Sequence, residues 1–154
     1  MLDTSVPAVN AALQRARKAI DERVPPKSQQ ATLRDLGEAA QRELVTAFVA
    51  AWGRADVPAI LNLLSDDAKF TMPPIPTWFQ GKEAIARFMS ERMFATAWRL
   101  VPVRASGQLA FACYQGPAFG VGALNVVSLR DRSISHMTGF LDPAVHARFS
   151  LSER

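Results

Sequence analysis

Residues 48–68, FVAAWGRADVPAILNLLSDDA, decide the fold of this chain because they join three elements of different kinds. A helical pattern ends at Gly53, and a shorter helix is predicted after Asp56, which has the acceptor side chain of an N-cap. Pro58 falls in the first helical turn, where its missing N–H costs nothing. Two adjacent aspartates then open a predicted strand at 68–72. The stretch therefore predicts a helix, a short helix and a strand in succession.

Two longer helices flank this unit. The preceding helix is predicted over 32–53, because apolar side chains recur there at helical spacing while charged residues occupy the other positions. Gly37 predicts a break in its first turns. The following helix is predicted over 82–94, after a glycine turn. Three helices are thus available to cover a sheet.

Four further strands are predicted towards the C-terminus, each bounded by turn residues. They cover residues 96–104, 108–115, 122–130 and 133–141. A helical turn is expected after Asp142 and Pro143. The Pro-rich segment 73–76 is predicted to leave the sheet as a stiff extended loop, because prolines fix φ and remove donors. Helices packed on a meandering, mostly antiparallel sheet make an α+β domain.

The composition limits the class of protein. With 154 residues, 49% of them hydrophobic, the chain is long enough for one globular domain with an appendage. Its net charge of +4 permits contact with nucleic acid without requiring it. The single cysteine, Cys113, excludes an intramolecular disulfide and a cysteine metal cluster. No apolar run of membrane-spanning length and no signal peptide are present, so the sequence predicts a cytoplasmic protein without a membrane partner.

The N-terminal residues predict a separate basic helix. Ser5 is a suitable N-cap and Pro7 lies in the first turn, so the helix is expected to run from Val6 to about Arg23. Its apolar stripe consists of Val9, Leu13, Ala16 and Ile20. Polar residues lie largely off that stripe, on a surface suited to base edges and phosphates, namely Asn10, Gln14, Arg15, Arg17 and Lys18. On the pattern alone, an ordinary basic amphipathic helix is the better interpretation, because short helices with three cations are common.

Proline and polar residues divide the chain into three parts. A Pro-Pro pair at 25–26 cannot continue the first helix, and the polar residues after it predict a hinge. The predicted parts are a helical segment at 1–23, a hinge or linker at 24–37 and the α+β domain at 38–154.

The domain resembles a known fold family. The quoted stretch 48–68, together with GKEAI at 81–85, resembles the SnoaL-like, ketosteroid-isomerase-like family over roughly residues 38–149. The resemblance implies a cone-shaped curved antiparallel sheet with three packed helices, the fold also called nuclear-transport-factor-two-like or cystatin-like. It also implies a pocket inside the curved sheet, and dimers are common in the family.

A second resemblance concerns transcription. SVPAVN at 5–10, followed by ALQRAR at 12–17, resembles the recognition helix in the fourth region of extracytoplasmic-function (ECF) sigma factors. Segments 70–81 and 107–114 are similar to the C-terminal extension of an actinobacterial-type group of these factors. The helix would then be the second half of a truncated helix-turn-helix. The implied contacts to promoter DNA in the longer parent come from Ser5, Asn10, Gln14, Arg15, Arg17 and Lys18.

The same resemblance implies partners for the longer parent protein. Promoter DNA and core RNA polymerase would be bound through N-terminal regions that this chain lacks. We therefore expect Met1 to be an internal start or a point of truncation.

The family's isomerases use a carboxylate base and two hydrogen-bond donors in an apolar cavity. Matching the shared motifs places Phe48 at the donor tyrosine, Met72 at the general-base aspartate and Asn125 at the protonated aspartate. Phe48 and Met72 can neither donate nor abstract a proton, whereas Asn125 can still bind a ligand by hydrogen bonds. The sequence therefore predicts no catalytic residues, no cofactor and no metal, and a protein that is not an enzyme.

An aromatic pocket is one interpretation of the remaining residues. The candidates are Phe48, Met72, Trp78, Phe79, Trp98, Tyr114 and Phe140, with Asn125 and His136 as the polar groups. Two alternatives stay open, that these residues only fill the core, and that Trp78 anchors another protein segment.

Two hypotheses follow for function. The first is a non-catalytic regulatory C-terminal domain of an alternative sigma factor, modulating transcription initiation through a small apolar ligand or through docking on other regions. The alternative is a stand-alone SnoaL-like isomerase or cyclase, or a binder of hydrophobic small molecules.

Overall fold

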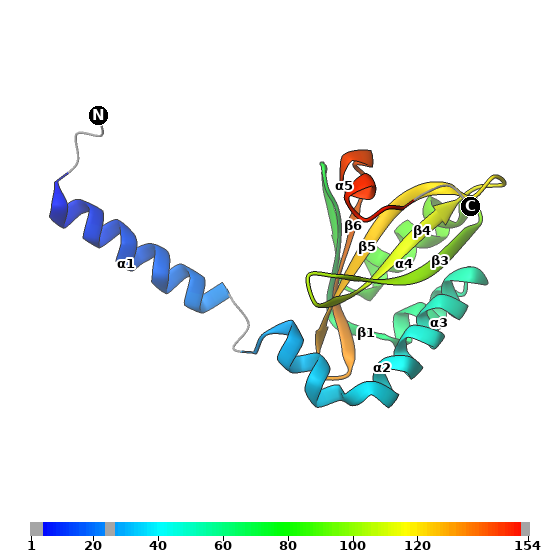
Figure 1. The fold of residues 1–154 in the computed structure, drawn as a ribbon, viewed down its shortest axis with the longest axis horizontal. Helices are drawn as coiled ribbons and strands as arrows, with labels where there is room; N and C mark the ends of the chain where they lie inside the picture. Colours follow the sequence, from blue (N-terminus) through cyan, green and yellow to red (C-terminus); the bar gives the residue numbers. More distant parts are fainter. Residues whose placement is uncertain (1–4, 24–26, 152–154) are drawn as a thin grey trace.

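The computed structural model describes residues 5–23 and 27–151. Helix α1 (Val6–Arg23) stands apart from the sheet in Figure 1. Its apolar stripe faces solvent, with Val9 and Ile20 51% and 57% exposed. The predicted helix and its bounds are confirmed.

The remaining elements form an α+β domain around one six-stranded sheet (Figure 1). The strands are β1 (Leu64–Met72), β2 (Ile75–Gln80), β3 (Trp98–Ala105), β4 (Gln108–Gln115), β5 (Gly120–Arg130) and β6 (Ser133–Phe140). Their order is β2-β1-β6-β5-β4-β3, with only β1 and β6 parallel. The predicted fold class, a mostly antiparallel curved sheet with packed helices, is confirmed.

The helices lie on the two faces of this sheet. They are α2 (Gln29–Gly53), α3 (Val57–Asn62), α4 (Lys82–Glu91), the 3-10 turn η1 (Met93–Ala95) and α5 (Pro143–Arg148). The Asp56 carboxylate caps α3 by accepting from the Ala59 N–H at 3.0 Å, as predicted. Gly37 has φ 78° and kinks α2, also as predicted. Helices α2, α3 and α4 cover one face, while α5 contacts β5.

The main core lies between the sheet and helices α2 to α4. Phe48 and Ile60 are fully buried there, and the Phe48 ring packs 4.9 Å from the Phe111 ring of β4. A smaller cluster on the opposite face joins Leu124 to Val145 of α5. Because both faces of the sheet are covered, alternate residues of a strand point either into the main core or towards the opposite face.

The prediction for the Pro-rich segment is wrong. Pro73 and Pro74, joined by a cis peptide bond, form a tight turn, and β2 then pairs antiparallel with β1. Phe70 lies opposite Phe79 in this hairpin. Pro76 is compatible with a strand because β2 is at the edge of the sheet, where a missing N–H interrupts no central ladder.

The predicted linker at 24–37 is wrong for its second half. Ser28 caps α2 by accepting from the Ala31 N–H at 3.2 Å. The Gln29 side chain donates to the Leu129 carbonyl at 2.9 Å and accepts from the Leu129 N–H at 2.6 Å. Leu33 is buried in the core. These contacts make 29–36 part of the domain, and the proline pair at 25–26 lies outside the described residues.

Candidate functional site

A cavity of about 340 Å³ lies between the sheet and the helices that cover it. Every strand except β2 contributes to its wall, together with α2, α4 and η1. The wall consists of Trp52, Phe70, Met72, Phe88, Arg92, Met93, Trp98, Cys113, Gln115, Gly122, Ala123, Asn125, Gly139 and Leu141. A mostly apolar wall with a few polar groups is typical of small-molecule sites.

Strand alternation places the sheet residues of this wall on one face. Phe70 and Met72 are two positions apart in β1, as are Ala123 and Asn125 in β5. Asn125 lies directly opposite Gly139 in β6. A Cβ on Gly139 would lie 3.6 Å from the Phe70 ring, so the missing side chain leaves room beside the Asn125 amide.

Two polar groups in the wall lack hydrogen-bond partners. Asn125 is 2% exposed, and neither the nitrogen nor the oxygen of its side-chain amide has a partner within the described residues. The indole N–H of Trp52, equally buried, has none either. An unpaired buried polar group costs roughly 1–3 kcal/mol. A bound molecule with complementary groups would recover that cost.

The mouth of the cavity lies at Arg92 and Gln115, the only exposed members of the wall. The Gln115 amide donates to the Thr96 hydroxyl at 2.9 Å. Nearby, the Trp98 indole N–H donates to the Met93 carbonyl at 2.8 Å, which fixes the ring. The mouth therefore presents the positive charge of Arg92 and the side-chain amide of Gln115, which is held by its hydrogen bond to Thr96.

The cavity offers little acid–base chemistry. Cys113 is buried in its wall, and burial raises the pKa of that thiol to about 12. The thiol therefore stays protonated near neutral pH, and a protonated thiol is a poor nucleophile. Among the wall residues, all of which the structure describes, there is no carboxylate, histidine, lysine or tyrosine. The arrangement can bind by hydrogen bonds and shape, without a group suited to proton abstraction.

Three predicted pocket residues, Met72, Trp98 and Asn125, lie together in this wall. Phe48 does not, because its ring is buried in the core of α2 and β4. The family resemblance assigns this position to a donor tyrosine. In this chain the side chain there packs in the core and does not line the cavity.

Trp78 and Phe79 do not line this cavity, although both are candidate pocket residues. Both belong to the edge strand β2, where the Trp78 side chain is 65% exposed. The Phe79 ring stacks on Phe88 at 4.2 Å between centroids. The reason is the hairpin, which pairs this segment with β1. The role of Trp78 as an anchor for another protein segment stays a prediction.

His136 lies on the opposite face of the sheet from the cavity. Thr71 stands between the inward-facing residues of β1, and its hydroxyl lies 3.0 Å from His136 Nε2. Simple alternation along β6 is interrupted at a bulge, where Ile134 pairs with Leu129 but His136 pairs with Ser128. Partial burial, with a smaller contribution from Lys69, lowers the pKa of His136.

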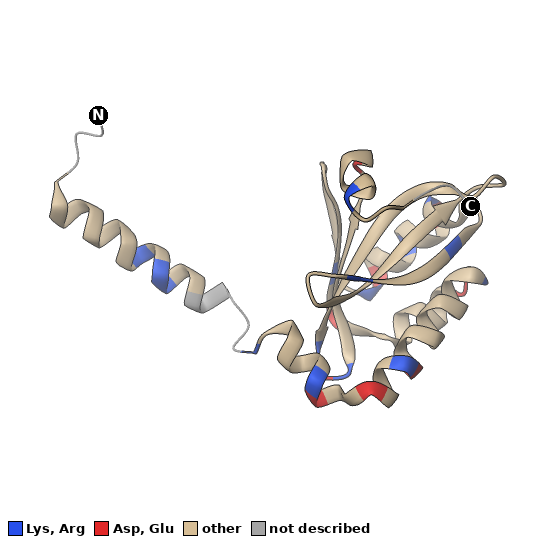
Figure 2. Ribbon diagram, in the orientation of Figure 1, with Lys and Arg blue, Asp and Glu red and all other residues tan. Residues whose placement is uncertain are grey.

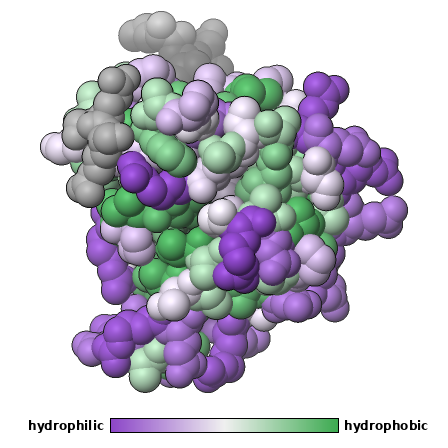
Figure 3. All heavy atoms as spheres, turned by 90° about the vertical axis from the view of Figure 1, so that its right-hand side faces the viewer, coloured by the Kyte–Doolittle hydropathy of each residue, from purple (hydrophilic) through white to green (hydrophobic). Residues whose placement is uncertain are grey.

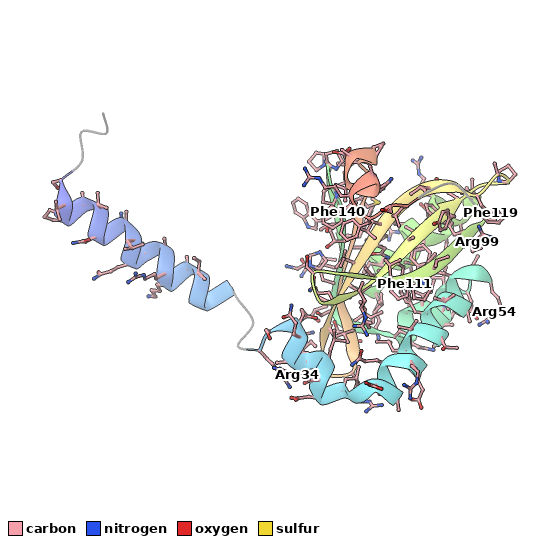
Figure 4. The ribbon with its side chains drawn as sticks, in the orientation of Figure 1. Arg34, Arg54, Arg99, Phe111, Phe119 and Phe140 are labelled. Atoms are coloured by element: carbon pink, nitrogen blue, oxygen red, sulfur yellow. The ribbon has the colours of Figure 1, made fainter. Side chains whose placement is uncertain are left out.

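Tyr114 and Phe140 also lie outside the wall. The Arg99 guanidinium lies 5.4 Å from the Tyr114 ring centroid and 4.8 Å from that of Phe119, at the end of the sheet shown in Figure 4. Phe140 packs in the smaller cluster beside α5, where His146 Nε2 lies 2.8 Å from the Phe140 carbonyl oxygen. The candidate aromatic residues of the pocket therefore lie on both faces of the sheet.

The remaining wall residues were missed by sequence reasoning. They are Trp52, Phe70, Phe88, Arg92, Met93, Cys113, Gln115, Gly122, Ala123, Gly139 and Leu141. Two-residue alternation from Met72 and Asn125 would have found Phe70 and Ala123. Arg92 carried no comparable signal, because it depends on where α4 ends.

The predicted DNA contacts all lie exposed on α1 or at its start. They are Ser5, Asn10, Gln14, Arg15, Arg17 and Lys18. Asn10, Gln14 and Lys18 follow at four-residue steps and so share a face. Figure 2 shows basic residues gathered in the second half of α1. These residues are placed together, and their contact with DNA stays a prediction.

Metal sites and membrane-spanning helices are both absent from the described ranges. No group of three or more histidine, cysteine or acidic residues in 5–23 and 27–151 is arranged to hold a metal ion. None of the helices described has the length and apolar character needed to cross a membrane.

A family assignment follows from the comparison with known sequences. The sequence model of the SnoaL-like domain family matches residues 45–148. The chain belongs to the SnoaL-like family.

Solved structures agree on this fold. An NTF-2 like protein of unknown function from Burkholderia xenovorans has a TM-score of 0.60 and 14% identity, covering 74% of this chain and 95% of its own. A SnoaL-like protein of unknown function from Burkholderia thailandensis has a TM-score of 0.55 and 19% identity, covering 66% and 94%.

A second comparison, with named proteins, finds relatives of a different functional class. The SnoaL-like chain is 30% identical to the ECF RNA polymerase sigma factor SigG of two Mycobacterium tuberculosis strains, CDC 1551 and H37Rv. The similarity covers 99% of this chain but 42% of each relative. It therefore includes α1, which lies outside the matched SnoaL-like region.

Proposed function

We propose that this chain is a non-catalytic regulatory C-terminal part of an ECF sigma factor, and that its cavity binds a small, mostly apolar ligand that modulates transcription initiation. The observation that carries the proposal is the extent of the similarity to SigG. It covers 99% of the chain, so it extends over the sequence of α1 as well as over the matched SnoaL-like region. A SnoaL-like domain alone would account only for residues 45–148.

Helix α1 has the surface that promoter recognition requires. Arg15, Arg17 and Lys18 supply positive charge for phosphates, and Asn10 and Gln14 supply amides suited to base edges. Its exposed apolar stripe, including Val9 and Leu13, is suited to packing against another helix of a helix-turn-helix. In the proposal, α1 reads DNA only within that larger element.

Helix α2 gives the cavity a physical route to α1. Trp52, near its C-terminal end, lines the cavity. Gln29, at its first position, is tied to Leu129 at the end of β5 and lies close in sequence to α1. A ligand that shifts Trp52 would therefore act on the helix that leads back to the DNA-binding segment.

The lack of a base in the cavity wall supports binding over turnover. An isomerase needs a group that removes a proton at the reacting carbon. Met72 stands where the family resemblance expects that base, and Cys113 is held protonated. The wall retains Asn125 for recognition. An isomerase or cyclase would have to use a group outside the wall.

The first test reads the genomic sequence upstream of Met1. In-frame codons for a polymerase-binding region and for the rest of the helix-turn-helix support the proposal. A stop codon followed by a ribosome-binding site before Met1 contradicts it.

The second test is run-off transcription by core RNA polymerase with the full-length protein that carries this chain. Replacing Arg15 and Arg17 together by alanine should weaken promoter binding and reduce its dependence on salt. Arg34→Ala is the matched control, an exposed arginine on α2 (Figure 4). Equal promoter binding by the double variant, the control and the wild type would reject the DNA-reading role of α1.

A further inference from the structure

The structure assigns the cavity to an amphipathic organic anion, whose apolar body fills the cavity, whose inner end hydrogen-bonds Asn125 and whose acidic group meets Arg92 at the mouth. This inference rests on the part of the proposed function that gives the cavity a small-molecule ligand. It adds the chemical class of that ligand and names Arg92 as the residue that selects for charge.

The wall changes character from its inner end to its mouth. Phe70 and Asn125 at the inner end are each 2% exposed. Arg92 and Gln115 at the other end are exposed to solvent. A ligand that fits this gradient has its apolar part inside and its charged group at the mouth, where water still solvates the charge. Figure 3, which views the molecule from the right-hand side of Figure 1, shows hydrophobic surface between hydrophilic side chains on that face.

The charge at the mouth is not neutralised by the protein. Within the described ranges the Arg92 guanidinium makes no hydrogen bond or ion pair, whereas Arg87, five residues earlier and within α4, pairs with Glu83 at 3.5 Å. No carboxylate lines the cavity. The planar, always charged guanidinium suits a carboxylate or sulfonate, which it can bind through two parallel hydrogen bonds.

A ligand that fills the inner end of the cavity needs a polar atom there. Asn125 presents one donor group and one acceptor without partners, and Trp52 presents a further donor. A ligand hydroxyl or carbonyl would pair with these groups. The cavity volume of about 340 Å³ lies at the lower end of the roughly 300–1,000 Å³ found for ligand pockets. Together these limits describe a small ring system or a short chain with a polar group at each end.

A pair of fluorescent probes separates charge from apolar burial. Anilinonaphthalene sulfonate carries a sulfonate, and N-phenylnaphthylamine has the same ring skeleton without it. Both are titrated into the full chain by fluorescence, with wild type, Arg92→Gln, Arg92→Lys and Arg87→Gln. Arg87→Gln is the matched control, because it removes an exposed arginine of α4, the helix that ends just before Arg92, and Arg87 does not line the cavity.

We expect Arg92→Gln to weaken sulfonate binding by about fivefold, the size of an exposed ion pair. It should leave the affinity for the neutral probe unchanged. Arg92→Lys should restore part of the loss, and Arg87→Gln should change neither affinity. Added salt should weaken sulfonate binding in the wild type more than in Arg92→Gln.

The inner contact is tested by displacing the sulfonate probe with naphthoate and with a hydroxynaphthoate. The wild type should prefer the hydroxyl-bearing acid, and Asn125→Leu should abolish that preference.

Three outcomes overturn the inference. Equal loss of both probes in Arg92→Gln, or no loss of either, contradicts charge selection while the cavity remains a binding site, so the proposed function stands. No difference between the two acids in the wild type contradicts the inner contact. Failure of both probes to bind the wild type removes the inference together with the ligand-binding part of the proposed function.

Discussion

Replacing Asn125 by leucine should make the ligand-free protein more stable. The Asn125 side chain is 2% exposed, and both its amide nitrogen and its amide oxygen lack partners. Leucine has the same branched skeleton of side-chain heavy atoms and no polar atom, and the cavity beside Asn125 leaves room for its larger methyl groups, so the substitution removes two unpaired groups without opening a hole. Such a replacement is neutral to stabilising, whereas an unpaired buried group costs roughly 1–3 kcal/mol.

The gain can be estimated from these terms. The middle of this range gives a net gain of about 2 kcal/mol in the free energy of unfolding. For a domain of this size each kcal/mol shifts the melting temperature by about 2–4 °C, so Tm should rise by roughly 4–8 °C. In urea the midpoint should increase while the m-value stays constant, because the surface exposed on unfolding does not change.

The matched control is Gln115→Leu. Gln115 is also an amide of the cavity wall, but it is exposed and donates to the Thr96 hydroxyl at 2.9 Å. Its replacement should bring no gain and a small loss, because a satisfied hydrogen bond is removed. A drop in Tm for Asn125→Leu, or equal shifts in the two variants, would refute the reasoning that the Asn125 amide is an unpaired buried group.

Other expectations concern single side chains. Phe48→Ala should cost about 3–5 kcal/mol in urea unfolding, because the fully buried ring packs on Phe111; a loss below about 1 kcal/mol would contradict its place in the core. Burial holds the pKa of Cys113 at about 12. The rate of its alkylation by iodoacetamide in the folded protein should therefore keep rising with pH beyond about pH 9, whereas in urea the rate should level off near pH 9. The lowered pKa of His136 means that the unfolded chain binds more protons, so stability present above pH 6.5 should decrease as pH falls below that value. In His136→Gln this decrease in urea stability should become smaller, and an unchanged pH profile would exclude His136 as its source.

Periodicity and end signals were enough to predict most elements. Asp56 with Pro58 marks the start of α3, and Gly37 marks the kink of α2, because both signals act locally. The strands were found from alternation and turn residues. Local signals failed where the outcome depends on a distant partner. Pro76 lies in a strand only because that strand is at the edge of the sheet, which the local sequence does not specify.

The candidate site was less predictable than the fold for a related reason. Alternation identifies two faces of a strand but does not say which face is inside, and a bulge exchanges them. Simple alternation would put His136 on the same face as Ile134, yet the bulge between their pairing partners puts Ile134 in the core and His136 on the other side. Asn125 and Met72, which a family motif rather than periodicity located, both line the cavity. Arg92 reaches the site from the end of α4, a position that no strand pattern encodes.

The stability and binding experiments together separate two explanations for Asn125. If the amide were merely tolerated, Asn125→Leu would stabilise the protein and leave the preference between the two naphthoates unchanged. If the amide is kept for recognition, the same substitution should raise Tm and abolish that preference. A gain in stability coupled to a loss of selectivity is the expected signature of a binding site, because a group that a ligand satisfies is unpaired without it. The cavity has Gly139 opposite this amide and an unneutralised Arg92 at its mouth, and this arrangement favours the second explanation.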